Sequence, residues 1–290
     1  MAARVALATC ATYPSGEEVE GDLLLDACRA AGLDAEYRDW AEPGLDWADY
    51  DLVVIRSTWD YVPRRAEFEA WAASVPRLAN PASIVSWNAN KTYLAVLADA
   101  GVPVVDTRFV EPGQQPQFPQ ATEFVVKPAE GAGSMGAGRF TAADDGARRH
   151  VEALHRAGRT VMLQPYLADV DTAGETALIF FDGVYSHAIR KGPMLPESHV
   201  YPLDATEDEL FVAEEITPRT PSAAEHDLAR AALAAVPGGE RLLYARVDLL
   251  PTPAGPVVGE LELIEPSLFL AYNAGAPLRL AAAIAARAQQ

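Results

Sequence analysis

Two short apolar runs, each followed by a helical pattern, open the chain and limit the folds it can adopt. The runs at residues 4–9 and 51–55 are predicted strands, and apolar residues recur at helical spacing over residues 17–31 and 64–74. Strands that alternate with helices pair in parallel, because a helical crossover returns the chain to the same end of the sheet. The sequence therefore predicts a parallel α/β module over residues 1–88.

Helices and strands are also mixed over residues 89–166, which we predict to form a second module. A helical pattern covers residues 90–100, and Thr141 and Asp144 have the spacing of a capping box, which predicts a helix ending near residue 157. Further predicted strands lie at residues 102–110, 123–127 and 161–166. This mixture is typical of an α+β arrangement.

Residues 167–290 are predicted to form a third module around an antiparallel sheet. Asp182-Gly183 joins two strand runs, and this dipeptide favours a two-residue hairpin because both positions accept a positive φ. The predicted elements are strands at residues 176–181, 184–190, 244–250 and 257–263 and helices at residues 222–236 and 276–290. The predicted fold class is therefore α/β and α+β, with a parallel N-terminal module and two α+β subdomains.

Composition and charge exclude several classes of partner. The chain has 290 residues, of which 50% are hydrophobic and 22% are charged, as in globular proteins. Its formal charge of −18 would repel a nucleic acid backbone or an anionic membrane surface. Cys10 and Cys28 form no disulfide framework, and no apolar stretch approaches the roughly 18 residues of a membrane span. We therefore expect a cytoplasmic protein with neither nucleic acid nor membrane as partner.

Lysine is rare in this chain, since only Lys91, Lys127 and Lys191 among 23 basic residues are lysines. Where arginine supplies most surface cations, a lysine indicates a place that needs a compact, flexible ammonium group, such as a phosphate site. Genomic composition bias is the alternative explanation, and the counts alone favour it. The sequence around each lysine is needed to distinguish the two explanations.

A glycine-rich segment, EGAGSMGAG at residues 130–138, follows the predicted strand that ends in Lys127. Glycine lets backbone N–H groups approach an oxyanion closely, so the strand, the lysine and the segment together indicate a phosphate-binding loop. The spacing differs from the Walker loop and from the dinucleotide-binding fingerprint. By itself the segment is equally typical of a disordered surface turn.

Two pairs of charged residues lie on predicted strands near the C-terminus. Arg246 and Asp248 are two residues apart on one strand, as are Glu260 and Glu262 on the next, so each pair faces one side of the sheet. If the strands form a hairpin, three carboxylates and a guanidinium come together, and oxygen-rich clusters of this kind bind Mg²⁺. An exposed polar face of a hairpin is the alternative.

The segment RSTWDY at residues 56–61 follows a predicted strand of the first module, so its side chains should project at the carboxyl edge of the sheet. Arg56 suits a carboxylate and Asp60 an ammonium group, which together predict a site for a small zwitterion. The alternative is a local ion pair over a packed tryptophan.

Taken in order, these features resemble the ATP-grasp superfamily of ATP-dependent carboxylate–amine ligases over essentially the whole chain. Lys91 in NKTY and Lys127 in FVVKP correspond to the two nucleotide lysines, and EGAGSMGAG corresponds to the loop that closes over the phosphates. The resemblance places the backbone around Tyr166 and Leu167 at the adenine and Glu175 at the ribose. The nucleotide-binding residues that it implies are Lys91, Lys127, Gly131, Gly133, Ser134, Gly136, Gln164, Tyr166, Leu167 and Glu175.

The resemblance also implies catalytic, metal-binding and substrate-binding residues. Arg190 falls where relatives hold a substrate or phosphate arginine, and Arg246 would neutralise phosphate charge. Asp248, Glu260 and Glu262 correspond to Mg²⁺ ligands, although Glu262 stands where many relatives have Asn. The implied cofactors are ATP and two Mg²⁺ ions, with Mn²⁺ able to substitute, and a homodimer is common in the superfamily. The predicted substrate-binding residues are Arg56, Asp60 and Arg190, and no role is assigned to Lys191, His187 and His199.

Within the superfamily, the strings VIRSTWDY and ELELIEPSLF are most similar to the branch of cyclo-ligases that act on O-ureido-D-serine. The resemblance implies that ATP activates the carboxylate of a small amino-acid-like substrate as an acyl phosphate. A nitrogen of the same substrate would then attack it, as a step in antibiotic biosynthesis. The alternatives are an intermolecular amino-acid or peptide ligase, a small-molecule kinase of the same fold, and a nucleotide-binding module without activity.

Overall fold

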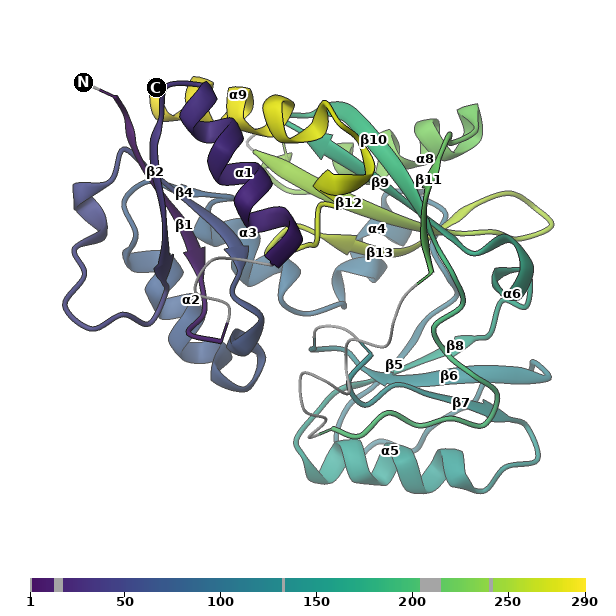
Figure 1. Ribbon diagram of the computed structural model, residues 1–290. Helices are drawn as coiled ribbons and strands as arrows, with labels where there is room; N and C mark the ends of the chain where they lie inside the picture. Colours follow the sequence, from purple (N-terminus) through teal and green to yellow (C-terminus); the bar gives the residue numbers. More distant parts are fainter. Residues whose placement is uncertain (1, 13–17, 132–133, 204–214, 240–241) are drawn as a thin grey trace.

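The N-terminal part of the chain folds into a parallel sheet with the strand order β2-β1-β3-β4 (Figure 1). The structure is a computed structural model that describes residues 2–12, 18–131, 134–203, 215–239 and 242–290. The strands are β1 (Arg4–Thr9), β2 (Asp34–Asp39), β3 (Leu52–Ser57) and β4 (Leu78–Ala79). The predicted parallel pairing of the first two apolar runs is confirmed.

Helices cover both faces of this sheet, because both faces are apolar. Helices α1 (Glu18–Ala30) and α9 (Ala276–Ala288) pack on the face that carries Val5 and Leu7. The other face packs against an aromatic cluster that includes Trp40, Phe68 and Trp71. The elements around this cluster are α2 (Arg65–Ser74), α3 (Ala82–Asn88), η1 (Trp47–Asp49) and η2 (Trp59–Arg64). The last helix of the chain therefore packs with the first.

An antiparallel sheet with the order β5-β8-β6-β7 forms the central part of the chain. Its strands are β5 (Arg108–Val110), β6 (Glu123–Pro128), β7 (Gly138–Thr141) and β8 (Val161–Pro165), and the helix α4 (Tyr93–Asp99) precedes them. Helix α5 (Gly146–Arg156) packs on one face through Val151 and Leu154. Helix α5 lies below this sheet in Figure 1, so the opposite face of the sheet turns toward the rest of the molecule.

Two predictions for the central part are wrong. Residues 102–110 do not form one strand, because only Arg108–Val110 pairs with β8, while Val104 forms an isolated bridge with Val258. The capping box is not formed either, because Thr141 ends β7 and the carboxylate of Asp144 accepts the N–H of Gly146. In the first case a bridge to the distant Val258 sets the backbone conformation, and in the second the contact of Asp144 with Gly146 does so.

A second antiparallel sheet, with the order β11-β10-β9-β12-β13, forms the C-terminal part. Its elements are α6 (Val170–Ala173), β9 (Glu175–Phe181), β10 (Val184–Lys191), β11 (Ile216–Arg219), α8 (Ala223–Ala234), β12 (Tyr244–Leu250), β13 (Val257–Glu262) and η4 (Leu270–Tyr272). The predicted hairpin is confirmed, since Asp182 and Gly183 have φ angles of 47° and 75°. The capping box between Ser222 and Glu225 is also confirmed.

One face of the C-terminal sheet changes from apolar to charged along its strands. Ile189 and Tyr244 pack in the core shared with α1 and α9, and on the same face Lys191 and Asp248 follow further along β10 and β12. The opposite face, with Val247, packs in a core that includes α8. The charged end of the first face lies opposite the central sheet (Figure 1). In the ranges that the structure describes, no helix is long and apolar enough to cross a membrane.

Candidate active site

A cavity of about 210 Å³ lies between the central sheet and the charged end of the C-terminal sheet. Most residues that the sequence analysis predicts to bind nucleotide or metal line this one cavity. They are Lys127, Ser134, Gln164, Tyr166, Leu167, Glu175, Arg246, Asp248, Glu260 and Glu262, joined by Lys191. Residues more than 130 positions apart in the chain thus meet at one place.

The pairing of β12 with β13 explains how four of these charges share one face. Arg246 lies opposite Glu262, and Asp248 lies opposite Glu260. Because side chains alternate along a strand, the intervening Val247 points to the other face, where it is buried. The hairpin expected from the two-residue spacing is therefore present.

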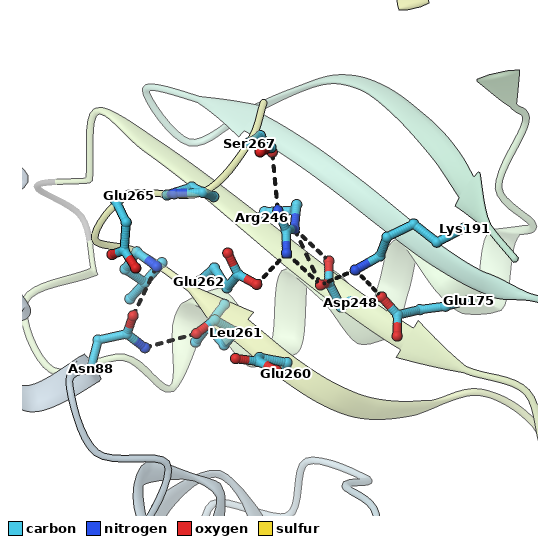
Figure 2. Close-up of polar contacts among 12 residues, drawn as sticks. Asn88, Glu175, Lys191, Arg246, Asp248, Glu260, Leu261, Glu262, Glu265 and Ser267 are labelled. Atoms are coloured by element: carbon cyan, nitrogen blue, oxygen red, sulfur yellow. Dashed lines mark hydrogen bonds and ion pairs between the residues drawn. The ribbon is translucent and has the colours of Figure 1, made fainter. Parts of the chain in front are cut away.

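Cations lie among these carboxylates and pair with them (Figure 2). Nε of Arg246 lies 2.9 Å from Oδ1 of Asp248, and a second nitrogen of Arg246 pairs with Glu262. Nζ of Lys191 lies 2.8 Å from Oδ2 of Asp248 and also pairs with Glu175. Asp248, which is 2% exposed, is thus held between a guanidinium and an ammonium group.

Four carboxylates and three cations line the cavity, and burial raises the pKa of two of the carboxylates. Burial raises the pKa of Glu262 to about 7, and the charges of Glu260 and Asp248 add to the rise against the opposing effect of Arg246. Burial also raises the pKa of Glu175 to about 7, although Lys191 opposes it. Burial acts on Asp248 as well, but Arg246 and Lys191 outweigh it and hold the pKa of Asp248 below its usual value. A further cation in the cavity would therefore be stabilised.

The chemistry of this donor set fits Mg²⁺. Mg²⁺ prefers hard oxygen ligands, and Asp248, Glu260 and Glu262 present carboxylates to the same cavity. Among the described residues, no three acidic, His or Cys side chains already form a cluster that could hold a metal ion. The three carboxylates are instead paired with Arg246, Lys191 and Lys91. Their role as metal ligands stays a prediction.

The two predicted nucleotide lysines differ in their partners. Nζ of Lys91 donates a hydrogen bond of 2.6 Å to the carbonyl oxygen of Gly131 and lies 3.0 Å from Glu260. Lys127 lines the cavity, and in the described part of the chain no group accepts a hydrogen bond from its ammonium group. Burial lowers the pKa of Lys127, against the opposing effect of Glu260. Lys127 is therefore a half-buried cation that an anionic ligand would compensate.

Two described residues of the glycine-rich segment, Ser134 and Ala137, line the cavity. The carbonyl of Gly131 is held by Lys91. Gly136 has a φ of 66°, and a Cβ at this position would lie 2.9 Å from the side chain of Leu203, so the backbone here requires glycine. Gly133, which the resemblance also places at the nucleotide, lies outside the described residues.

The end of β8 and the residues after it form the side of the cavity predicted for adenine. The N–H of Tyr166 donates to the carbonyl of Glu123 at 2.9 Å, so it is already used. No described residue accepts the N–H of Leu167, which leaves this group for a ligand. Nε2 of Gln164 donates to Oγ1 of Thr107 at 2.8 Å, which holds the Gln164 side chain in place.

Arg190 does not reach the cavity, contrary to the prediction. Its side chain donates hydrogen bonds to the carbonyl oxygens of Ala173 and Thr172. Lys191, left without a role by the sequence analysis, lines the cavity instead. The two residues are neighbours on β10 and point to opposite faces, so a strand prediction without a known inward face cannot choose between them. The sequence signal that could have identified Lys191 is the apolar Ile189, two residues away on the same face, which is buried in the structure.

Arg56 and Asp60 also lie away from the cavity walls. Asp60 accepts hydrogen bonds from Nε1 of Trp40 at 2.7 Å and from Arg64 at 3.2 Å, which matches the alternative of a local ion pair over a packed tryptophan. Arg56 is 5% exposed and donates to the carbonyl oxygen of Pro266 at 3.1 Å. The structure therefore does not bring the predicted zwitterion site together with the nucleotide residues.

Comparisons with known proteins agree with this geometry. Residues 5–80 match the family described as D-cycloserine synthetase DcsG, N-terminal domain. The cycloserine biosynthesis protein DcsG of Streptomyces lavendulae is 41% identical over 287 residues, which cover 91% of this chain and 92% of that protein. A crystal structure of D-cycloserine synthetase DcsG superposes with a TM-score of 0.85 at 39% identity, covering 98% of this chain and 99% of that one.

A more distant solved structure has the same fold. The RimK-domain ATP-grasp protein from Sphaerobacter thermophilus DSM 20745 superposes with a TM-score of 0.67 at 18% identity, covering 99% of this chain and all of that one. The ATP-grasp architecture expected from the sequence is thereby confirmed. The chain belongs to the D-cycloserine synthetase family and is an ATP-dependent ligase with the ATP-grasp fold.

Proposed function

We propose that the chain uses ATP to activate the carboxylate of O-ureido-D-serine and closes the molecule into the ring of D-cycloserine. The observation that carries the proposal is the cavity in which Lys127, Lys191 and Arg246 meet four carboxylates. Similarity to proteins named for cycloserine biosynthesis over more than nine tenths of the chain supports the choice of substrate. Phosphoryl transfer depends chiefly on positioning and on charge, and this cavity offers both.

The cations of the cavity have separate tasks in this proposal. Lys127 has no partner among the described residues and would bind the nucleotide phosphates. Lys191 and Arg246 both pair with Asp248 on the charged face. They would neutralise the charge that develops as a phosphoryl group moves to the substrate carboxylate. Leu167 would donate its free N–H to the base.

The carboxylates would hold the metal. Asp248, Glu260 and Glu262 are the proposed ligands of Mg²⁺, which supplies positive charge at the phosphates when it is bound. Glu175, beside Lys191, stays the candidate for the ribose. Burial, with the charges of Glu260 and Asp248 added to it, raises the pKa of Glu262, and a bound cation would offset both effects, which supports this assignment.

The proposed reaction balances in three steps. A carboxylate oxygen of the substrate attacks the γ-phosphorus of ATP, and the bond to the ADP oxygen breaks, which gives an acyl phosphate and ADP. The ureido nitrogen bonded to the side-chain oxygen then attacks the acyl carbon, loses its proton to solvent and expels inorganic phosphate. Water finally hydrolyses the bond between the ring nitrogen and the carbamoyl carbon, which leaves a proton on the ring nitrogen and releases carbamic acid, and this decomposes to CO₂ and ammonia. Burial of the cavity would protect the acyl phosphate from early hydrolysis.

A direct assay distinguishes this reaction from its alternatives. The enzyme is incubated with ATP, Mg²⁺ and O-ureido-D-serine, and ADP, phosphate and D-cycloserine are measured together. Equal amounts of the three products are expected. A stable phosphorylated substrate without free phosphate would indicate a kinase, and turnover only with a second amino acid would indicate an intermolecular ligase. O-ureido-L-serine serves as the control for the configuration of the substrate.

Two further features stay predictions from the sequence. We expect the protein in the cytoplasm because Cys10 and Cys28 form no disulfide framework, which suits a reducing compartment. We expect a homodimer because this state is common in the superfamily. Sedimentation analysis of the purified chain tests the second expectation.

A further inference from the structure

Residues 265–270, which follow β13, form a segment whose backbone is held by side chains from distant parts of the chain. The segment has no helix or strand structure before η4 begins at Leu270. Its Phe269 has a φ of 50°, which is uncommon for a bulky residue and needs support from its surroundings. We call residues 265–270 the connecting segment.

Three side chains near the carboxyl edge of the N-terminal sheet hold the connecting segment from one side. The carboxylate of Glu20 accepts the N–H of Leu268 at 3.2 Å and the N–H of Leu270 at 2.8 Å. Arg56 donates to the carbonyl of Pro266 at 3.1 Å, and Nε1 of Trp59 donates to the carbonyl of Glu265 at 3.1 Å. Glu20 and Arg56 are 8% and 5% exposed, so these bonds are shielded from water.

The C-terminal sheet holds the same segment from the other side. Nη1 of Arg246 donates to the carbonyl of Ser267 at 3.1 Å (Figure 2). Nε2 of His187 contacts the carbonyls of Leu268 and Phe269 at 3.0 and 3.2 Å. The connecting segment therefore lies between the N-terminal sheet and an arginine of the active-site cavity.

We propose that Glu20, Arg56 and Trp59 are positioning residues for the ligase reaction. They set the path of the connecting segment, and the carbonyl of Ser267 in turn orients the guanidinium of Arg246 toward Asp248 and Glu262. The proposal rests on the role proposed above for Arg246. It gives Arg56 a task that does not require contact with substrate.

The chemistry of Glu20 explains why this position is sensitive. Each carboxylate oxygen accepts one backbone N–H, and Arg56, 3.8 Å away, supplies the compensating charge. In Glu20→Gln one oxygen becomes an NH₂ group, which turns two donors toward each other at a buried site. The connecting segment then has to move, and Arg246 moves with the Ser267 carbonyl.

Glu20→Gln therefore tests the proposal, with Glu225→Gln as the matched control. Glu225 is also 8% exposed and also accepts a backbone N–H, but its partners are Thr176, Ser222 and Arg219. We expect Glu20→Gln to lower kcat by about tenfold or more while KM for ATP changes less than about twofold, since misplaced catalytic groups affect turnover first. Glu225→Gln should keep kcat within about twofold at a similar loss of Tm.

A double-mutant cycle with Arg246→Lys separates a positioning role from a general loss of stability. If Glu20 acts through Arg246, Glu20→Gln lowers kcat by less than about twofold in the Arg246→Lys background. The same factor in both backgrounds, or an equal loss of kcat in Glu225→Gln, overturns the proposal. An Arg246→Lys variant with normal turnover would instead overturn the role proposed for Arg246.

Trp59→Phe keeps the proposal testable if Glu20→Gln does not fold. It removes the N–H that bonds the carbonyl of Glu265 and keeps an aromatic ring at the position. We expect a smaller loss of kcat, about threefold, that again disappears in the Arg246→Lys background. A loss of equal size in both backgrounds would contradict the proposal.

Discussion

The charged residues at the carboxyl edge of the N-terminal sheet and those on the face of the C-terminal sheet are of the same kinds, but their surroundings differ. At the edge, both carboxylate oxygens of Asp60 accept hydrogen bonds, and Arg56 lies between Glu20 and a backbone carbonyl. On the face, Lys127 has no partner in the described part of the chain, and the pKa of Glu262 is raised to about 7. Among the described residues, the edge keeps one buried nitrogen without an acceptor, Nη1 of Arg56, whereas the face has an ammonium group without an acceptor and more carboxylates than cations.

This difference shows what separates a binding cluster from a structural one. In a balanced cluster, most charged groups already have partners within the protein. A ligand that enters it has to displace these partners, and each lost partner costs the desolvation of a buried group. A ligand that enters an unbalanced cluster gains partners without displacing any. The residue types alone do not distinguish the two cases, because Arg and carboxylate residues close in sequence occur in both.

The strongest test of the comparison replaces Lys191 and its neighbour Arg190. Lys191→Met keeps the aliphatic length and removes the charge paired with Glu175 and Asp248, so we expect kcat to fall about 100- to 1000-fold. Arg190→Met should change kcat less than about threefold, because Arg190 bonds backbone carbonyls outside the cavity. Steady-state release of ADP measures both variants. Equal losses would contradict the assignment of the two side chains to opposite faces.

Lys127→Met tests the charged face of the C-terminal sheet by removing the lysine that has no hydrogen-bond acceptor among the described residues. We expect kcat/KM for ATP to fall about 100-fold, because Lys127 is the proposed phosphate cation. Its Tm should stay the same or rise, because a half-buried charge without a hydrogen-bond acceptor among the described residues is removed. Lys191→Met, in contrast, removes the ion-pair partner of Glu175 and leaves Asp248 with Arg246 alone, so it should lose about 3 kcal/mol of unfolding free energy. Calorimetry of the two variants checks this contrast, which a lower Tm in Lys127→Met would refute.

The connecting segment, which lies between the two regions, predicts a pH dependence of stability through His187 of β10. Burial lowers the pKa of His187 to about 4 from 6.5, so below pH 6.5 the unfolded chain binds a proton that the folded chain does not. This residue should therefore lower the unfolding free energy by about 2 kcal/mol between pH 7 and pH 5. Urea unfolding of the wild type and of His187→Gln at both values isolates the contribution. The same pH dependence in both proteins would exclude His187 as its source.

The smallest effect is expected for Asp60→Asn. The variant keeps an acceptor for Trp40 and weakens a partly exposed pair with Arg64, which is worth about 1 kcal/mol or less. We expect KM for O-ureido-D-serine and kcat to stay within about threefold of the wild type. A large rise of this KM with unchanged Tm would restore Asp60 as a substrate ligand.

Much of the fold could be predicted because strong local patterns agree with the final pairing. The apolar runs of β1 and β3 and the Asp182-Gly183 turn each have a local signal that the tertiary structure keeps. Strand β2, Asp34–Asp39, has no such signal, because it is an edge strand of largely polar residues that pairs only with β1. The spacing of Arg246 with Asp248 predicted a shared face for the same local reason.

The sequence by itself determined which residues share a face of a strand, because side chains alternate with a period of two. It therefore determined the charged hairpin and, by resemblance, the family. Only the tertiary structure decided which face of β10 looks inward, and hence that Lys191 rather than Arg190 enters the cavity. It also brought Glu20 to Leu268 and Leu270, about 250 residues away along the chain. Both decisions depend on packing between distant elements, and no local pattern contains that information.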